Sequence, residues 1–109
     1  LRSARCAVCY DNLTLELLLP DLAPQTCRDY LDQLFAGQGG EALRRWRTLL
    51  TVFFASDGSV TKTAEQLFVH KNTVQYQLRK IAEATGFDPR RMDHAAIFQM
   101  ALLLIPDEP

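Results

Sequence analysis

The chain has 109 residues, of which 48% are hydrophobic and 23% charged, so it has the size and composition of one folded domain, and intrinsic disorder is excluded. Its apolar runs reach six residues against the roughly 20 needed to span a bilayer, and no signal peptide is recognisable, so we expect a cytoplasmic protein without membrane contact. The net charge of −1 by itself argues against a nucleic-acid-binding domain, which is usually basic.

The three cysteines are an odd number and lack the dense framework of a secreted disulfide scaffold. Cys6 and Cys9 form a C-x-x-C pair, but only two histidines could help to complete a zinc site, and no βαβ pattern of a thioredoxin-like site follows. We therefore expect reduced thiols that pack as small apolar groups, Cys27 included, with no metal and no cofactor. Because the chain begins at Leu1 rather than Met, we expect a fragment of a longer protein.

Residues 1–10 are interpreted as a short extended segment, which could be the remnant of an upstream domain, and residues 11–109 as a helical domain. Asp11 or Asn12 can cap a first helix that runs through Leu19 and ends at Pro20, although the leucines of this segment also alternate as in a strand. Pro24 suits the first turn of the next helix, which the glycines at positions 37, 39 and 40 end.

From Glu41 onward, apolar residues recur every three or four positions, which predicts a helix that ends at the turn Ser56–Asp57–Gly58. The arginines on its other faces are expected to be solvated. The apolar stripe, which we expect in the core, consists of Leu43, Trp46, Leu49, Leu50, Phe53 and Phe54.

Residues 59–86 have the pattern of two helices joined by three or four residues, which is the helix-turn-helix geometry. Ser59 is a suitable N-cap for the first helix, and Gly86 a suitable C-cap for a second helix over about residues 71–85. Val69, in the turn between them, is expected to fix the crossing angle together with Val74. The expected core faces, spaced at i, i+4 and i+7, consist of Val60, Ala64, Leu67, Val74, Leu78 and Ile81.

The opposite face of the second helix is polar and has no acidic residue between Lys71 and Ala82, whereas an ordinary solvated face mixes Glu with Lys. Asn and Gln can pair with adenine through two hydrogen bonds, Thr can contact a base or a phosphate, and Arg and Lys neutralise phosphates. The helix N-terminus adds partial positive charge where the helix would enter the major groove. We predict base or near-base contacts from Asn72, Thr73, Gln75 and Tyr76, and phosphate contacts from Lys62, His70, Lys71, Arg79 and Lys80.

The charge of the chain is unevenly distributed. Residues 59–91 hold six basic and three acidic side chains, a net charge of +3, whereas residues 92–109 hold three acidic side chains and no basic one. The overall value of −1 therefore conceals a basic segment, and it does not exclude DNA as a partner.

The run GSVTKTA at 58–64 and the run VHKNTV at 69–74, followed by Tyr76, resemble the C-terminal helix-turn-helix of PucR/CdaR-type bacterial transcriptional regulators. The helix pair is also similar in spacing to the DNA-binding end of Fis. The resemblance covers about nine-tenths of the chain, from Tyr10 to Leu103. It implies an all-α domain of about five or six helices, double-stranded DNA as partner, and an upstream sensory domain outside this chain. Because helix-turn-helix proteins commonly bind two half-sites, a homodimer or higher assembly is expected for the full-length protein.

Two positions depart from the family pattern. Gln77 stands where Arg is usual, so one cationic contact that the resemblance implies is lacking. Arg91-Met92 stands where an Asp-Pro pair usually opens the last helix, so we expect Asp93 to cap that helix. His94 is expected on the surface of its first turn. Since the last helix is apolar on more than one face, part of it is expected to pack against a second protomer or the missing sensory region.

Two other function classes are compared with the same residues. A helical interaction or dimerisation module that does not read DNA would have the polar face of the second helix covered by a partner or by the chain's own helices. An enzyme is disfavoured because no nucleophile–base pair, carboxylate dyad or phosphate loop is visible. His70 likewise has no partner at a spacing that suits catalysis or metal binding.

Overall fold

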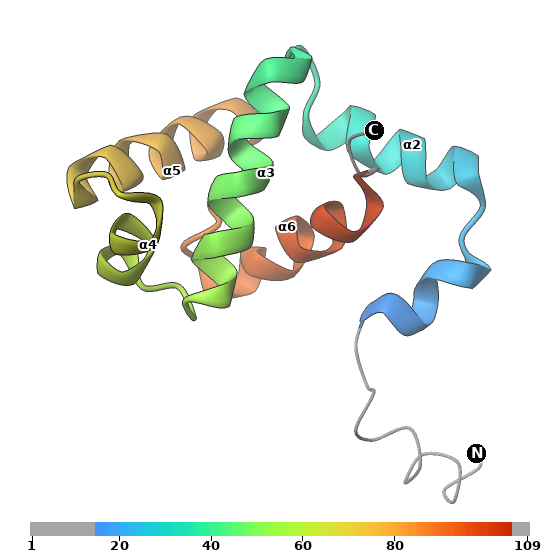
Figure 1. The fold of residues 1–109 in the computed structure, drawn as a ribbon. Coiled ribbons are helices and arrows are strands. Elements are labelled where there is room, and N and C mark those ends of the chain that lie inside the picture. Colours follow the sequence, from blue (N-terminus) through green and yellow to red (C-terminus); the bar gives the residue numbers. More distant parts are fainter. Residues whose placement is uncertain (1–14, 106–109) are drawn as a thin grey trace, which may run out of the picture.

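The computed structural model describes residues 15–105, which form one 3₁₀-helix and five α-helices (Figure 1). No strand occurs within this range, so the expected all-α class is confirmed. The segment at residues 1–10 that was predicted to be extended lies outside the described residues. In chain order, the elements are η2 (Leu15–Asp21), α2 (Pro24–Leu34), α3 (Gly40–Ala55), α4 (Val60–Leu67), α5 (Lys71–Thr85) and α6 (Met92–Leu104).

The first element differs from the α-helix predicted to end at Pro20. η2 is a 3₁₀-helix that contains Pro20 and continues to Asp21. Proline has no amide hydrogen, and in an α-helix its ring would clash with the carbonyl four residues earlier, which accounts for the tighter helix type in this short piece. α2 begins at Pro24 as predicted, because its fixed φ suits the first helical turn.

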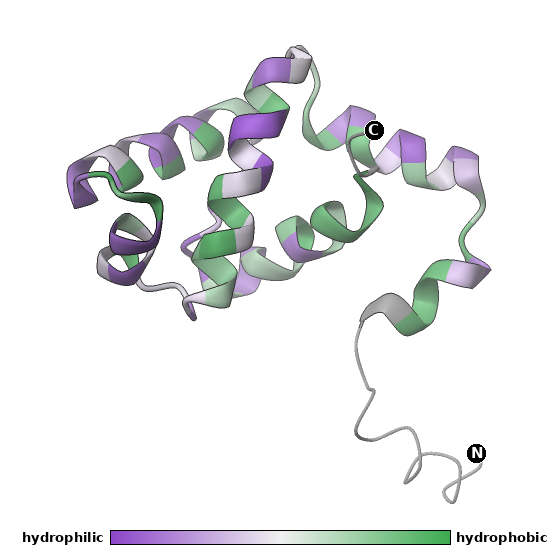
Figure 2. Cartoon of the chain, in the orientation of Figure 1, coloured by the Kyte–Doolittle hydropathy of each residue, from purple (hydrophilic) through white to green (hydrophobic). Residues whose placement is uncertain are grey.

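The core forms where α3, α5 and α6 meet, and it is closed by the end of α2 and by Ala64 of α4. The stripe predicted on α3 is buried except for Leu43 and Phe54, which are partly buried. Figure 2 shows polar and apolar residues alternating along α3 and α5, as expected for helices with one face in a core. The buried apolar residues are Leu34, Phe35, Trp46, Leu49, Leu50, Phe53, Ala64, Val74, Leu78, Ile81, Phe98 and Ala101.

Local caps set the boundaries of the helix-turn-helix. The Ser59 side chain accepts a hydrogen bond from the Lys62 amide at 3.1 Å, and Gly86 ends α5 in the left-handed conformation at φ 82°. Phe68 ends α4 and is also left-handed, so the chain reverses there, and the next amide, that of Val69, donates to the Ala64 carbonyl at 3.0 Å. Val69 is 42% exposed and lines a shallow pocket together with Leu67 and Val74, so it lies at the edge of the helix pair and not in the buried core.

The start of α6 also differs from its prediction. Arg91, not Asp93, is the N-cap. Asp93 lies in the first turn, where its carboxylate interacts favourably with the helix dipole but does not cap the helix. His94 is half-buried rather than on the surface, because its Nδ1 accepts a hydrogen bond from the Asp88 amide at 3.0 Å and its ring stands edge-on to that of Phe87. None of the helices in residues 15–105 is long and apolar enough to cross a membrane.

Candidate nucleic-acid interface

The face of α5 opposite the core exposes the side chains that the sequence predicted. Val74, Leu78 and Ile81 anchor the helix with at most 1% of their surface accessible, so the opposite face points outward. The other helices of residues 15–105 do not cover this face. An interaction module whose own helices covered the polar face of α5 would have buried these side chains. The exposed residues at the predicted positions are Lys62, His70, Lys71, Asn72, Thr73, Gln75, Tyr76, Arg79 and Lys80.

His70 shapes the N-terminus of α5. It is the N-cap, and its Nδ1 accepts a hydrogen bond from the Asn72 amide at 3.0 Å. In a neutral imidazole the proton then lies on Nε2, which becomes a donor suited to a phosphate oxygen. The first turn of α5 contains no acidic residue, so no carboxylate of its own neutralises the partial positive charge at this end.

On the exposed face of α5, the Tyr76 ring lies close to the charged groups of Arg79 and Lys80. The Arg79 guanidinium carbon lies 5.5 Å from the centre of the Tyr76 ring, and the Lys80 Nζ lies 5.8 Å from it. Both distances are within the range of a cation–π contact. Since Tyr76 is 47% exposed, its ring holds the two charges at the surface, where they can meet a phosphate backbone.

The positive charge of the basic segment is not all available. Arg90 pairs with Asp88 at 2.9 Å and Arg91 pairs with Asp93 at 2.7 Å. The Arg90 side chain lowers the pKa of Asp88 through its hydrogen bond, and the same bond raises the pKa of Arg90. Within residues 15–105, no carboxylate forms an ion pair with the four cations predicted to bind phosphates, which are Lys62, Lys71, Arg79 and Lys80.

Gln75 has a protein partner that its place on the helix face did not predict. Its Oε1 accepts a hydrogen bond from Arg90 Nη1 at 3.3 Å, which joins α5 to the loop before α6. The contact spans 15 positions, so no local pattern in the sequence could have indicated it.

A groove of about 350 Å³ runs between α3 and the start of α5. Arg45 and Thr48 line it from α3, and Thr73 and Gln77 line it from α5. The sequence assigned Arg45 only to a solvated face, but it borders the same groove as Thr73, a predicted base contact. Gln77 stands where the family pattern has Arg, and it is half-buried in the lining of this groove. Arg45 is the arginine among the residues that line the groove.

No group of three or more metal-binding side chains occurs in the part of the chain that the structure describes, 15–105. Cys6 and Cys9 lie outside that range. Cys27 is a half-buried free thiol on α2.

Comparison with known proteins decides the family. The family model of the PucR C-terminal helix-turn-helix domain matches residues 46–104, which is more than half of the chain and includes α4, α5 and most of α3. The chain belongs to this family. The predicted resemblance to the PucR-type helix-turn-helix is confirmed.

The curated relatives of this PucR-type domain are longer proteins. The carbohydrate diacid regulator of Escherichia coli (strain K12) is 34% identical over 100 residues, which are 87% of this chain and 25% of that protein. The uncharacterized protein YsfB of Bacillus subtilis (strain 168) is 27% identical over 100 residues, 90% of this chain and 26% of that protein. The chain thus spans about a quarter of the length of these relatives. No solved structure matches significantly.

Proposed function

We propose that the chain is the sequence-specific DNA-binding domain of a transcriptional regulator and that α5 enters the major groove of double-stranded DNA. The observation that carries this proposal is the outer face of α5, which is exposed, rich in hydrogen-bond donors and free of acidic residues from Lys71 to Ala82. The major groove, about 12 Å wide, admits one α-helix. The similarity to a carbohydrate diacid regulator supports the same function.

The contacts follow from the position of each side chain along α4 and α5. Residues in the first two turns of α5 would enter the groove first, so Asn72, Thr73, Gln75 and Tyr76 are placed at or near base edges. The cations would meet the flanking phosphates, which set affinity rather than sequence preference. This phosphate-binding group comprises Lys62, His70, Lys71, Arg79 and Lys80.

The remaining features of the full-length protein belong to the same proposal. Residues 11–109 form the DNA-binding domain, and an upstream sensory domain controls it in the cytoplasm. Because one α5 helix reads only a few base pairs, two copies would bind half-sites one helical turn apart, so the full-length protein acts as a homodimer or a higher assembly.

The salt dependence of binding tests the phosphate contacts. Arg79→Ala should weaken binding to every duplex alike and reduce the slope of log K against log salt concentration by about one unit, because one phosphate contact releases roughly 0.9 counterion. Arg28→Ala is the matched control, since it removes an exposed arginine from α2. Binding by the unaltered chain that does not depend on salt would contradict the proposal, as would equal slopes for the two variants.

Base discrimination tests the readout. Asn72→Ala should reduce the preference at one base pair by roughly 1–3 kcal/mol and leave the salt slope unchanged, because the side chain carries no charge. The measurement is competition between duplexes that differ at single positions. Equal loss of affinity for all duplexes would show that Asn72 contacts the backbone and not a base.

A further inference from the structure

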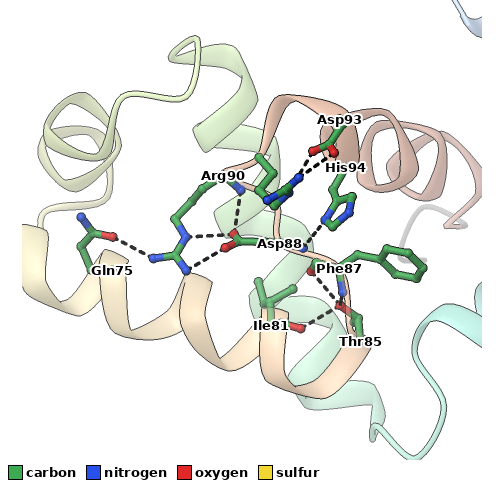
Figure 3. Close-up of polar contacts among 9 residues, drawn as sticks. Gln75, Ile81, Thr85, Phe87, Asp88, Arg90, Asp93 and His94 are labelled. Carbon is green, nitrogen blue, oxygen red and sulfur yellow. Dashed lines mark hydrogen bonds and ion pairs between the residues drawn. The ribbon is translucent and has the colours of Figure 1, made fainter.

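A chain of polar contacts runs from α6 to the outer face of α5 (Figure 3). The Nδ1 of His94 accepts a hydrogen bond from the Asp88 amide at 3.0 Å. The Asp88 carboxylate accepts from Arg90 Nε and Nη2, both at 2.9 Å, so the guanidinium is held by two parallel bonds. The remaining Arg90 nitrogen, Nη1, donates to Gln75 Oε1 at 3.3 Å.

The loop that carries Arg90 is fixed at several points. The Arg90 amide also donates to Asp88 Oδ1 at 2.9 Å, so backbone and side chain share one acceptor. The Phe87 amide donates to Thr85 Oγ1 at 3.2 Å, and Pro89 is buried. Because a two-bond arginine–carboxylate pair has a defined geometry, the position of the guanidinium follows from the loop.

The bond from Arg90 determines how the Gln75 amide is oriented. Figure 3 shows the Gln75 oxygen directed toward Arg90 and its nitrogen on the other side. An unrestrained glutamine reads adenine through both ends, since Oε1 accepts from N6 and Nε2 donates to N7. Here Oε1 already accepts a charge-assisted bond, which competes with the adenine N6 donor. Oε1 keeps one lone pair, but Nε2 has two donor hydrogens and no hydrogen-bond partner within residues 15–105, so it is the end more available to a base.

We propose that Arg90 is a positioning residue that makes Gln75 a donor toward DNA, so that Gln75 favours guanine over adenine. The major-groove edge of guanine presents two acceptors, N7 and O6, whereas adenine presents one acceptor and one donor. This inference rests on the proposed function, because it assigns a base preference to a residue of the reading face. It replaces the adenine preference that the residue type alone suggests.

Arg90→Met tests the proposal, because methionine lacks the guanidinium that holds Oε1. The control is Arg91→Met, which removes the neighbouring arginine of the same loop, whose side chain pairs with Asp93 instead. Gln75→Ala first identifies the base pair that Gln75 contacts, and duplexes with each base at that position are then compared. The unaltered protein and Arg91→Met should prefer guanine there, and Arg90→Met should shift the ratio toward adenine by roughly tenfold, the lower part of the range for a two-bond contact.

Two further measurements separate this inference from its alternatives. In the free protein, the side-chain amide resonances of Gln75 should shift in Arg90→Met and not in Arg91→Met, and this readout does not require DNA binding. Gln75→Glu leaves the loop intact but replaces the donor with an acceptor, so it should abolish the guanine preference even if Arg90→Met folds poorly.

An adenine preference in the unaltered protein would overturn the inference, as would a guanine preference that Arg90→Met or Gln75→Glu leaves unchanged. Unshifted Gln75 amide resonances in a folded Arg90→Met variant would also overturn it. Sequence-specific binding with any of these results would refute only the role of Arg90. If the unaltered protein showed no binding to any duplex, the proposed function itself would fail.

Discussion

Replacing Phe68 tests the turn that joins α4 to α5. Phe68 ends α4 with φ 58° and ψ 44°, in the left-handed region, and 94% of its surface is exposed. This conformation costs a residue with a Cβ about 1–2 kcal/mol, but it costs glycine nothing. Since only about 6% of a side chain of about 200 Å² is buried, its removal costs about 0.3 kcal/mol.

The predicted result is an inversion of the usual order of alanine and glycine. Phe68→Ala keeps the strained conformation, whereas Phe68→Gly relieves it and loses about 0.5–1 kcal/mol through the greater freedom of glycine in the unfolded chain. The glycine variant should therefore exceed the alanine variant in unfolding free energy by about 0.5–1 kcal/mol. The control is the pair Thr51→Ala and Thr51→Gly at an exposed position in the middle of α3. There the alanine variant should exceed the glycine variant in unfolding free energy by about 1 kcal/mol.

Urea denaturation followed by circular dichroism measures the unfolding free energies of both pairs of variants. The comparison holds where the dependence of the unfolding free energy on urea concentration is the same for the variants compared. A Phe68→Gly variant that is less stable than Phe68→Ala, by the margin seen at Thr51, would show that the turn is not left-handed in solution. The path of the chain into the N-terminus of α5 would then differ from the one described.

Three further predictions concern the core, the α5 cap and the loop before α6. Leu78→Ala should lower the unfolding free energy by about 2–5 kcal/mol, because Leu78 is fully buried, and a smaller loss in urea denaturation would contradict its place in the core. His70→Ala should cost about 1 kcal/mol through loss of the bond to the Asn72 amide, and His70→Asn should recover most of it; equal stability of all three proteins would exclude the cap. Arg90 lowers the pKa of Asp88 below its ordinary value of 3.8, so the stabilisation from this pair is present above pH 3.8 and is lost as the pH falls through the folded pKa. An NMR titration of the carboxyl group should show the lowered pKa, Arg90→Met should raise it, and no change would refute the pair.

The limits of the helix-turn-helix could be predicted because their signals are local. Ser59 and Gly86 form hydrogen bonds with backbone groups within four positions, so residue type and spacing indicated them directly. The core face of α5 was predicted for the same reason, since its period of 3.6 residues does not depend on what packs against it.

The features that could not be predicted depend on the path of the backbone. Val69 is exposed because the left-handed residue before it redirects the chain, and no pattern in the sequence marks a phenylalanine for that conformation. Asp93 has the residue type of a cap, but its carboxylate is engaged by Arg91. The bond from Arg90 to Gln75 and the approach of Arg45 to Thr73 join different elements, so they became visible only in the folded chain.

We propose that the outer face of α5 reads DNA sequence, and selection of bound duplexes from a random pool shows whether it does. The full-length protein that carries this domain should enrich one consensus sequence with two related half-sites. The double variant Asn72→Ala, Gln75→Ala should lose the preference at the base pairs that these residues contact, while Arg79→Ala should enrich the same consensus with lower affinity. A folded protein that enriches no sequence, or a consensus that the double variant leaves unchanged, would contradict the claim.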